Sequence, residues 1–355
     1  MVAFRPRPAF GPRSLLLRLG LLVSLPAAAA GLAGCASSTE LSDEERYDIY
    51  MTNATRYYEK QRYPESEQQV RKALAIEPAS DEAKLVLGWA LLYQATNPKV
   101  DAAERHFTLC AADDPGDFRY ALGLGFARFA AGKMLSDRAA AIEAQPPDLE
   151  TSRDDLARRS ASVRAEAETK LVGACEALEK TLALEPDYPR ALACLGQARM
   201  LLGRFDGATA AFERYLPSAE RTRRFLEEQA VDGPDEMERK LASDKIARNV
   251  SSEIEVRIAV ANVRYKQGRY AEAIEQLDKV LVLAPKNDEA LFNRGQCRYA
   301  QKEYDLSRAD LRKFLDVTSR PFDEMVRRSY DLLTEIERRA PMAAQSPAPE
   351  TAAPK

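Results

Sequence analysis

The segment KQGRYAEAIEQLDKVLVLAPKN, residues 266–287, decides the fold of this chain. It contains a turn glycine, Gly268, and an aromatic side chain two residues later at Tyr270. Ala273 and Leu277 follow at helical spacing, and a proline ends the run. This pattern predicts a helix that approaches its neighbour closely at Ala273 and fills the adjoining space with Leu277.

The same order of small, aromatic and large apolar residues returns along most of the chain. Two copies occupy residues 252–321, where equivalent positions such as Ala261 and Gly295 stand 34 residues apart. Four further copies occupy residues 47–216 and are less evenly spaced. Six copies at near-regular spacing predict a repeat protein built from helix pairs.

These copies resemble the tetratricopeptide repeat, a pair of antiparallel helices that touch through glycine or alanine. The resemblance implies an all-α fold, an α-solenoid of about six helix-turn-helix units. No single pair buries enough apolar surface to be stable alone, so stacked neighbours supply its core. Such a unit is a structural module and not a site, which favours binding over catalysis.

Three segments depart from the repeat. Residues 133–168 form an insertion inside the third unit, with a Pro146-Pro147 turn followed by apolar residues at near-heptad spacing. This spacing predicts a helix that runs into the third unit and pairs with an extended preceding helix. Residues 217–251, rich in Arg and Glu, are a charged helical linker or a degenerate unit. Residues 322–340 predict a capping helix, and residues 341–355 a disordered tail.

The first residues of the chain have the features of a targeting segment. Residues 1–34 hold four arginines and no acid, and an apolar run leads to Cys35. This run is too short for a membrane span of about 20 residues. The ending Leu32-Ala33-Gly34-Cys35 resembles the lipobox of bacterial lipoproteins. That resemblance implies removal of residues 1–34 and a diacylglycerol on the Cys35 sulfur, whereas the alternative is an ordinary signal peptide.

The residues that follow Cys35 indicate where in the cell the protein would be anchored. Residues 35–46 comprise the lipidated cysteine, a short polar tether and the start of the first helix. Several acyl chains are needed for a stable anchor, because one chain binds a membrane only marginally. Ala36, instead of an aspartate, implies sorting to the periplasmic face of the outer membrane.

Composition and charge exclude several classes of function. The chain has 45% hydrophobic and 30% charged residues, which suits a soluble helical protein, and its net charge is −3. An acidic chain offers phosphates no basic stripe, so we expect no nucleic-acid partner. His106 is the single histidine, and no Gly-rich phosphate loop or cysteine pair with metal spacing is present. We therefore expect no enzyme activity, metal or cofactor besides the acyl lipid on Cys35.

Four further cysteines, at Cys110, Cys175, Cys194 and Cys297, occupy repeat positions that usually hold small apolar residues. Packing in the core is the simpler interpretation, because a free cysteine behaves as a small hydrophobe. An oxidising periplasm leaves open a bridge between Cys175 and Cys194 on consecutive helices.

The candidate binding site comes from the repeat resemblance. In tetratricopeptide arrays the first helix of each unit lines the concave face. The equivalent residues here are Tyr58, Leu85, Trp89, Leu92, Tyr93, Leu122, Phe126, Phe129, Ile258, Asn262, Tyr265, Phe292, Gln296 and Tyr299. An apolar, aromatic strip on such a face suits a helix or an extended peptide. The alternative is that these rings pack internally.

Together these features predict a non-enzymatic, membrane-anchored scaffold or adaptor. It would bind a protein or peptide partner on its concave face, in the assembly of an envelope complex. A lipoprotein that binds a small hydrophobic ligand and partners a transporter is the alternative. The most irregular region, between Leu85 and Leu171, is where we expect the specific function to be encoded.

Overall fold

The computed structural model describes residues 41–146, 152–232, 235–319 and 323–340. Within these ranges the chain forms thirteen α-helices and no strand, which confirms the predicted all-α fold. The chain divides into two compact units, the first ending at Leu202 and the second beginning at Gly203. The predicted signal segment and Cys35 lie outside the described residues.

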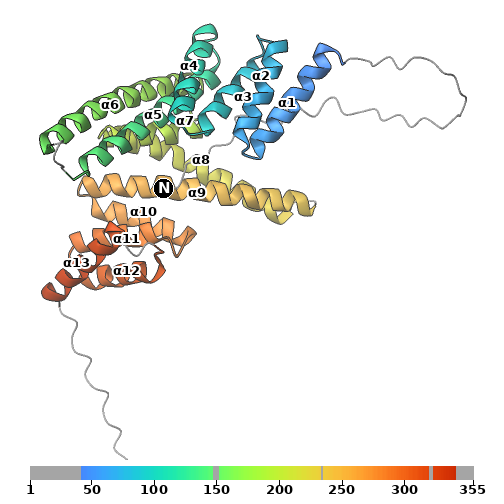
Figure 1. Ribbon diagram of the computed structural model, residues 1–355. Helices are drawn as coiled ribbons and strands as arrows, with labels where there is room; N and C mark the ends of the chain where they lie inside the picture. The colour runs from blue at the N-terminus through green and yellow to red at the C-terminus, as the bar shows by residue number, and fades with distance from the viewer. Residues whose placement is uncertain (1–40, 147–151, 233–234, 320–322, 341–355) are drawn as a thin grey trace, which may run out of the picture. The chain divides into compact units, whose positions relative to one another are not determined.

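The first unit consists of three antiparallel helix pairs and a seventh helix (Figure 1). Its helices are α1 (Asp43–Glu59), α2 (Tyr63–Ile76), α3 (Asp81–Tyr93), α4 (Asn97–Asp113), α5 (Phe118–Glu143), α6 (Arg153–Leu184) and α7 (Pro189–Leu201). The first helices of successive pairs contact one another in the order α1, α3, α5 and α7. They therefore form one layer, and α2, α4 and α6 pair with its members.

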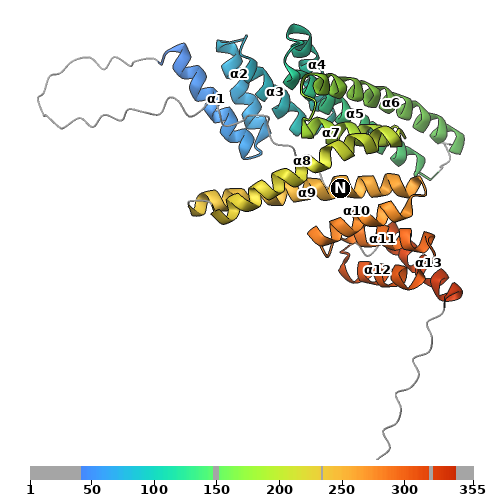
Figure 2. The ribbon, with the colours of Figure 1, turned by 180° about the vertical axis from the view of Figure 1, so that it is seen from behind.

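The second unit has the same organisation (Figure 2). Its helices are α8 (Phe205–Asp232), α9 (Glu236–Lys266), α10 (Tyr270–Leu283), α11 (Asp288–Ala300), α12 (Tyr304–Val317) and α13 (Glu324–Arg339). Here α9, α11 and α13 contact one another in turn and form the layer of first helices.

Glycine allows the helices of a pair to approach closely. A Cβ built on Gly125 of α5 would lie 2.7 Å from the side chain of Leu178 on α6. A Cβ on Gly295 of α11 would lie 2.9 Å from Leu311 on α12. Ala273 and Leu277 of the opening segment are fully buried in one cluster. The repeat pattern thus marks the places where helices touch.

The insertion in the third unit is a long helical hairpin, as the sequence predicts. Helix α5 has 26 residues, α6 has 32, and a capping box of Ser152 and Asp155 starts α6. Leu156 and Leu171 are buried in the seam between the two helices. Ser160 is buried there too, and its hydroxyl donates to the Ala139 carbonyl at 3.0 Å.

The described parts of residues 217–251 belong to the last part of α8 and the first part of α9. Helix α8 continues through Pro217, and α8 and α9 form an antiparallel hairpin. A buried ionic network joins the hairpin: Arg257 donates to Glu253 at 2.8 Å, and Arg223 donates to Glu253 at 3.1 Å. Arg257 also donates to Gln276 of α10 at 3.0 Å.

The C-terminal helix closes the second unit. Val326, Leu332 and Ile336 of α13 are buried against Leu291 and Phe314 of the last pair. Its other face is charged, which is the arrangement expected of a capping helix. Phe322, which the sequence places at the start of this helix, lies outside the described residues. No helix in the described ranges is long and apolar enough to cross a membrane.

Candidate functional site

The predicted groove residues of the first unit come together as a chain of aromatic rings. The Tyr93 ring lies 5.8 Å from Tyr58 and 5.7 Å from Trp89, measured between centroids. The Trp89 ring lies 5.6 Å from Phe126. These residues come from α1, α3 and α5, so the layer of first helices carries one continuous aromatic cluster.

Two members of this cluster were not found from the sequence. The Arg190 guanidinium, on α7, lies 4.9 Å from the Trp89 ring centroid and 5.2 Å from that of Phe126. It also donates a hydrogen bond to the Tyr93 hydroxyl at 3.2 Å. The ring of Tyr63, the first residue of α2, lies 5.3 Å from that of Tyr93 and is tilted by 37° relative to it. A cation held on two aromatic faces is favourable and orients the guanidinium.

Most of the groove residues in this unit are buried. Tyr58, Leu85, Trp89, Leu92, Leu122 and Phe126 form this buried set. Tyr93 and Arg190 are half-buried and carry the accessible surface of the cluster. Phe129, another predicted groove residue on α5, is also half-buried. The predicted strip therefore offers a partner only part of its rings, while the remainder packs internally.

Burial determines the protonation of the cluster. It raises the pKa of Tyr93, although the neighbouring Arg190 charge acts in the opposite direction. It also raises the pKa of Tyr58. Both phenols therefore stay protonated at physiological pH and can donate hydrogen bonds, while Arg190 supplies a positive charge.

The groove residues of the second unit lie on α9 and α11. Ile258 and Phe292 are buried in its core, whereas Tyr265 is 38% exposed. Asn262, Gln296 and Tyr299 are half-buried. The side-chain amide of Asn293 donates to Asn262 at 3.1 Å, and Arg339 of α13 lies 5.7 Å from the Tyr299 ring centroid. This face is more polar than that of the first unit.

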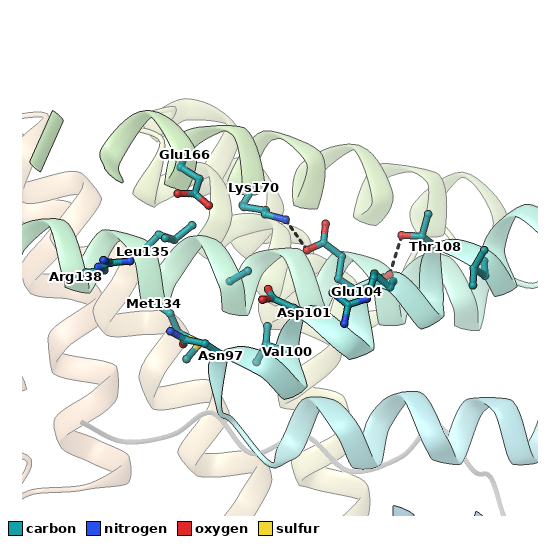
Figure 3. Close-up of a pocket in the computed structure, with 13 residues that line it drawn as sticks. Asn97, Val100, Asp101, Glu104, Thr108, Met134, Leu135, Arg138, Glu166 and Lys170 are labelled. Atoms are coloured by element: carbon teal, nitrogen blue, oxygen red, sulfur yellow. Dashed lines mark hydrogen bonds and ion pairs between the residues drawn. The ribbon is translucent and has the colours of Figure 1, made fainter. Parts of the chain in front are cut away.

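A cleft of about 880 Å³ lies elsewhere in the first unit, between α4, α5 and α6 (Figure 3). None of the predicted groove residues lines it. Its lining consists of Asn97, Val100, Asp101, Glu104, Arg105, Thr108, Leu109, Ala131, Met134, Leu135, Arg138, Glu166 and Lys170. The Lys170 ammonium and the Glu104 carboxylate form an ion pair at 2.7 Å across it. The lining of the cleft is thus strongly charged, and its apolar surface is smaller than its polar surface.

His106 has the geometry of a structural residue. Its Nε2 lies 2.8 Å from the Lys84 carbonyl and 3.7 Å from the Cys110 sulfur. Burial lowers the pKa of His106, so the ring is neutral at physiological pH. A ring nitrogen that donates to a backbone carbonyl cannot take a proton from Cys110, whose pKa burial raises. Among the described residues no group of three or more His, Cys, Asp or Glu could hold a metal ion.

The four cysteines within the described ranges are all buried. Cys175 of α6 and Cys194 of α7 are 2% and 1% exposed, respectively. Burial, together with the neighbouring Cys175, raises the pKa of Cys194. Thiols of this kind are unreactive, which agrees with core packing.

Comparison with known proteins identifies the repeat. The tetratricopeptide repeat family model matches residues 173–221 and 259–324, which is less than half of the chain. Among curated proteins, none matches this sequence.

Solved structures of tetratricopeptide proteins are similar at low identity. Pseudomonas aeruginosa PilF is 15% identical with a TM-score of 0.48, over 84% of this chain and 99% of that one. A thermophilic protein of Thermus thermophilus is 19% identical with a TM-score of 0.41, over 72% and 99%. A Parabacteroides merdae protein is 17% identical with a TM-score of 0.37, over 82% and 98%. By the family model, this chain carries tetratricopeptide repeats at residues 173–221 and 259–324.

Proposed function

We propose that this protein is a non-enzymatic, lipid-anchored scaffold that binds a protein or peptide partner along its first helices. Tetratricopeptide repeats generally serve as protein–protein interaction scaffolds. The proposal rests on the aromatic cluster. In this cluster, aromatic rings from α1, α3 and α5 lie together with the Arg190 guanidinium from α7. Aromatic residues and arginine are the side chains that dominate binding energy at protein interfaces.

The accessible part of this face indicates the kind of partner. Phe129 and the accessible part of Tyr93 offer apolar contact, and the half-buried Arg190 offers a positive charge beside Tyr93. A peptide or helix with apolar anchors and nearby carbonyl or carboxylate oxygens matches this combination. The buried members of the cluster would hold the accessible ones in fixed orientations, which reduces the entropy lost on binding.

The anchor rests on the residues before the first helix. A capping box of Ser42 and Glu45 begins α1, with Ser42 only seven residues after Cys35. At about 3.5 Å per residue, this tether reaches at most about 25 Å. A lipid on Cys35 would hold the first unit close to the membrane surface, where it would meet other envelope components.

Site-specific photocrosslinking in the native cell tests the proposed face. A photoreactive phenylalanine analogue replaces Phe129 or Tyr265 on first helices, and Leu109 or Val282 on second helices as matched controls. Leu109 is 66% and Val282 80% exposed, so both controls are at least as accessible. We expect one protein adduct from the first-helix positions alone. Adducts from only the control positions would place the partner on the other face.

The cleft between α4, α5 and α6 is the observation that favours the alternative, a ligand-binding lipoprotein that partners a transporter. Its charged lining suits an amphipathic ligand better than a purely hydrophobic one. Solvent extraction of the purified protein followed by mass spectrometry distinguishes the two functions. A stoichiometric lipid in the extract would favour the ligand-binding function.

A further inference from the structure

The side chain of Arg190 reaches across the first-helix layer of the first unit. Arg190 belongs to the first turn of α7, which packs on α5, and α5 packs on α3. Its guanidinium lies over the rings of Phe126 on α5 and Trp89 on α3, and it donates to the Tyr93 hydroxyl on α3. Arg190 therefore extends past its neighbouring helix and links α7 to the helix beyond it.

This reach places a charged group over the middle of the aromatic cluster. The Cζ of Arg190 is 4.9 Å from the Trp89 ring centroid and 5.2 Å from that of Phe126. Both distances are within the limit of about 6 Å for a cation–π contact. Trp89 is 1% and Phe126 6% exposed, whereas Arg190 itself is half-buried. A partner can therefore reach the ring faces that Arg190 covers only after the guanidinium has moved.

The contacts that hold the guanidinium can break without any movement of the helices. Its hydrogen bond to the Tyr93 hydroxyl is 3.2 Å long, at the upper end of the usual range of about 2.7–3.2 Å. Burial raises the pKa of Tyr93, so this hydroxyl is a neutral acceptor. A carboxylate can accept two parallel hydrogen bonds from a guanidinium and is a stronger acceptor than a phenol. A carboxylate brought by a partner would therefore compete with Tyr93 for Arg190.

We propose that Arg190 is a latch that covers Trp89 and Phe126 in the free protein and is released by a partner that brings a carboxylate side chain. The released guanidinium pairs with that carboxylate, and an apolar side chain of the partner packs on the uncovered rings. This inference rests on the proposed function of the same face. It adds a closed state of the face and the chemistry of the residue that opens it.

A latch changes affinity in the opposite direction from a binding contact. The apparent affinity of a protein that is closed for part of the time is the intrinsic affinity multiplied by the open fraction. A substitution that weakens only the closed state therefore strengthens binding. Tyr93→Phe is such a substitution, because it removes the hydroxyl to which Arg190 donates and keeps both the ring and Arg190. If a partner bound this hydroxyl, the same substitution would weaken binding.

Acrylamide quenching of Trp89, the only tryptophan, tests the closed state in the free, full-length protein. We expect the quenching constant to rise in Tyr93→Phe and to rise at least twofold in Arg190→Ala. The first control, Tyr47→Phe, removes another hydrogen-bonded hydroxyl of the same unit. The second, Arg199→Ala, removes an ion-paired arginine near the other end of α7. Neither control should change the quenching constant, and circular dichroism confirms that all four variants keep their helices.

Fluorescence anisotropy tests the release of the latch with two labelled helical peptides, one of Leu and Glu, the other of Leu and Gln. We expect the wild type to bind the Leu/Glu peptide more tightly than the Leu/Gln peptide. Tyr93→Phe should bind the Leu/Glu peptide at least threefold more tightly than the wild type does. Arg190→Ala should bind the two peptides equally, because it has no guanidinium to recognise the carboxylates.

Four results would overturn the proposal. Unchanged quenching in both Tyr93→Phe and Arg190→Ala would show that Arg190 does not cover the indole, and would leave the proposed function of the face intact. Weaker binding of the Leu/Glu peptide to Tyr93→Phe would make the hydroxyl a binding contact. Equal affinity of the wild type for the two peptides would remove the role of the carboxylate. If neither peptide bound the wild type or Tyr93→Phe, release by such a partner would be wrong, and photocrosslinking at Phe129 would still test the proposed function separately.

Discussion

At the scale of single residues, the smallest side chains determine how the helices pack. Gly125 faces Leu178 so closely that a Cβ on Gly125 would lie 2.7 and 2.8 Å from two of its side-chain carbons and 3.4 Å from its backbone nitrogen. The nearest of these carbons is Cγ, the branch point of Leu178, which cannot move aside as freely as the end of a flexible side chain. The glycine is therefore required by the close approach of α5 and α6.

Replacement of this glycine with a bulky residue tests that account. We expect Gly125→Leu to lower the free energy of unfolding by about 1–3 kcal/mol, because added atoms overpack the α5–α6 contact. Urea denaturation measures the change. The control Ala161→Leu adds bulk at an exposed position of α6 and should change stability by less than about 0.5 kcal/mol. If the two substitutions lowered the free energy of unfolding equally, the close contact of α5 and α6 at Gly125 would be contradicted.

The single histidine makes a second prediction, about pH. Burial lowers the pKa of His106 below its ordinary value, with the neighbouring Arg71 and Lys84 charges acting in the same direction. The unfolded chain therefore binds a proton more readily than the folded chain, and stability falls as pH drops below about 6.5. His106→Gln should flatten the dependence of unfolding free energy on pH between about 7.5 and 5.5. An unchanged slope would mean that other titrating groups account for the whole pH dependence of the unfolding free energy.

The third residue-scale prediction concerns Cys35. Without its sulfur no thioether to diacylglycerol can form, so Cys35→Ser should move the protein from the membrane to the soluble fraction. Cell fractionation measures this, and Cys297→Ser, a buried thiol far along the chain, is the control. Retention of Cys35→Ser in the membrane fraction would show that something other than this lipid holds the protein there.

At the scale of elements, ionic contacts hold α8, α9 and α10 together. Glu253 is 1% and Arg257 3% exposed, and both Arg257 and Arg223 donate to Glu253. Removal of one partner from a buried pair leaves an uncompensated charge, which costs more than the pair itself contributes. The stability of the hairpin therefore depends on Glu253.

We expect Glu253→Ala to lower the free energy of unfolding by about 1.5–3 kcal/mol, because the buried Arg257 loses its charge-assisted hydrogen bonds to Glu253 and keeps Glu220 as an anionic partner. Glu275→Ala is the matched control, since Glu275 pairs with Lys279 on the exposed side of α10 at 2.8 Å. An exposed pair contributes about 0–1 kcal/mol. Thermal or urea unfolding measures both, and a loss of less than about 1 kcal/mol for Glu253→Ala would rule out the network as a major source of stability.

The sequence predicts the helix pairs well because each is specified locally. Gly88, Gly125 and Gly295 mark contacts, and the 34-residue spacing sets the order of the elements. It does not predict that α8 continues through Pro217. A proline costs one helix hydrogen bond, and packing contacts from elsewhere in the chain can offset that loss.

The same limit applies to the candidate sites. Trp89 and Phe126 could be assigned to the first-helix layer from repeat position alone. Arg190 could not be assigned, because the two aromatic rings that it contacts lie on other helices, α3 and α5. No residue near Arg190 in the sequence indicates these contacts. The cleft could not be found either, since it depends on how three helices of unequal length lie against one another.

At the scale of the whole molecule, two units of the same architecture follow each other along the chain. Each has a layer of first helices, and each contains a hairpin longer than an ordinary repeat. The repeats supply the fold, and the features that distinguish this chain are the aromatic cluster with Arg190 and the charged cleft. The central claim is that the first of these binds the partner.

The most direct test of that claim is the fluorescence of Trp89 during titration with the partner recovered by crosslinking. Trp89 is the only tryptophan, and it lies under Arg190 in the centre of the aromatic cluster. A partner that contacts Arg190 and Tyr93 changes the charge and polarity around the indole. The account predicts a saturable change in Trp89 emission, strongly reduced in Arg190→Gln. Tight binding of the partner with no change in Trp89 emission would contradict it.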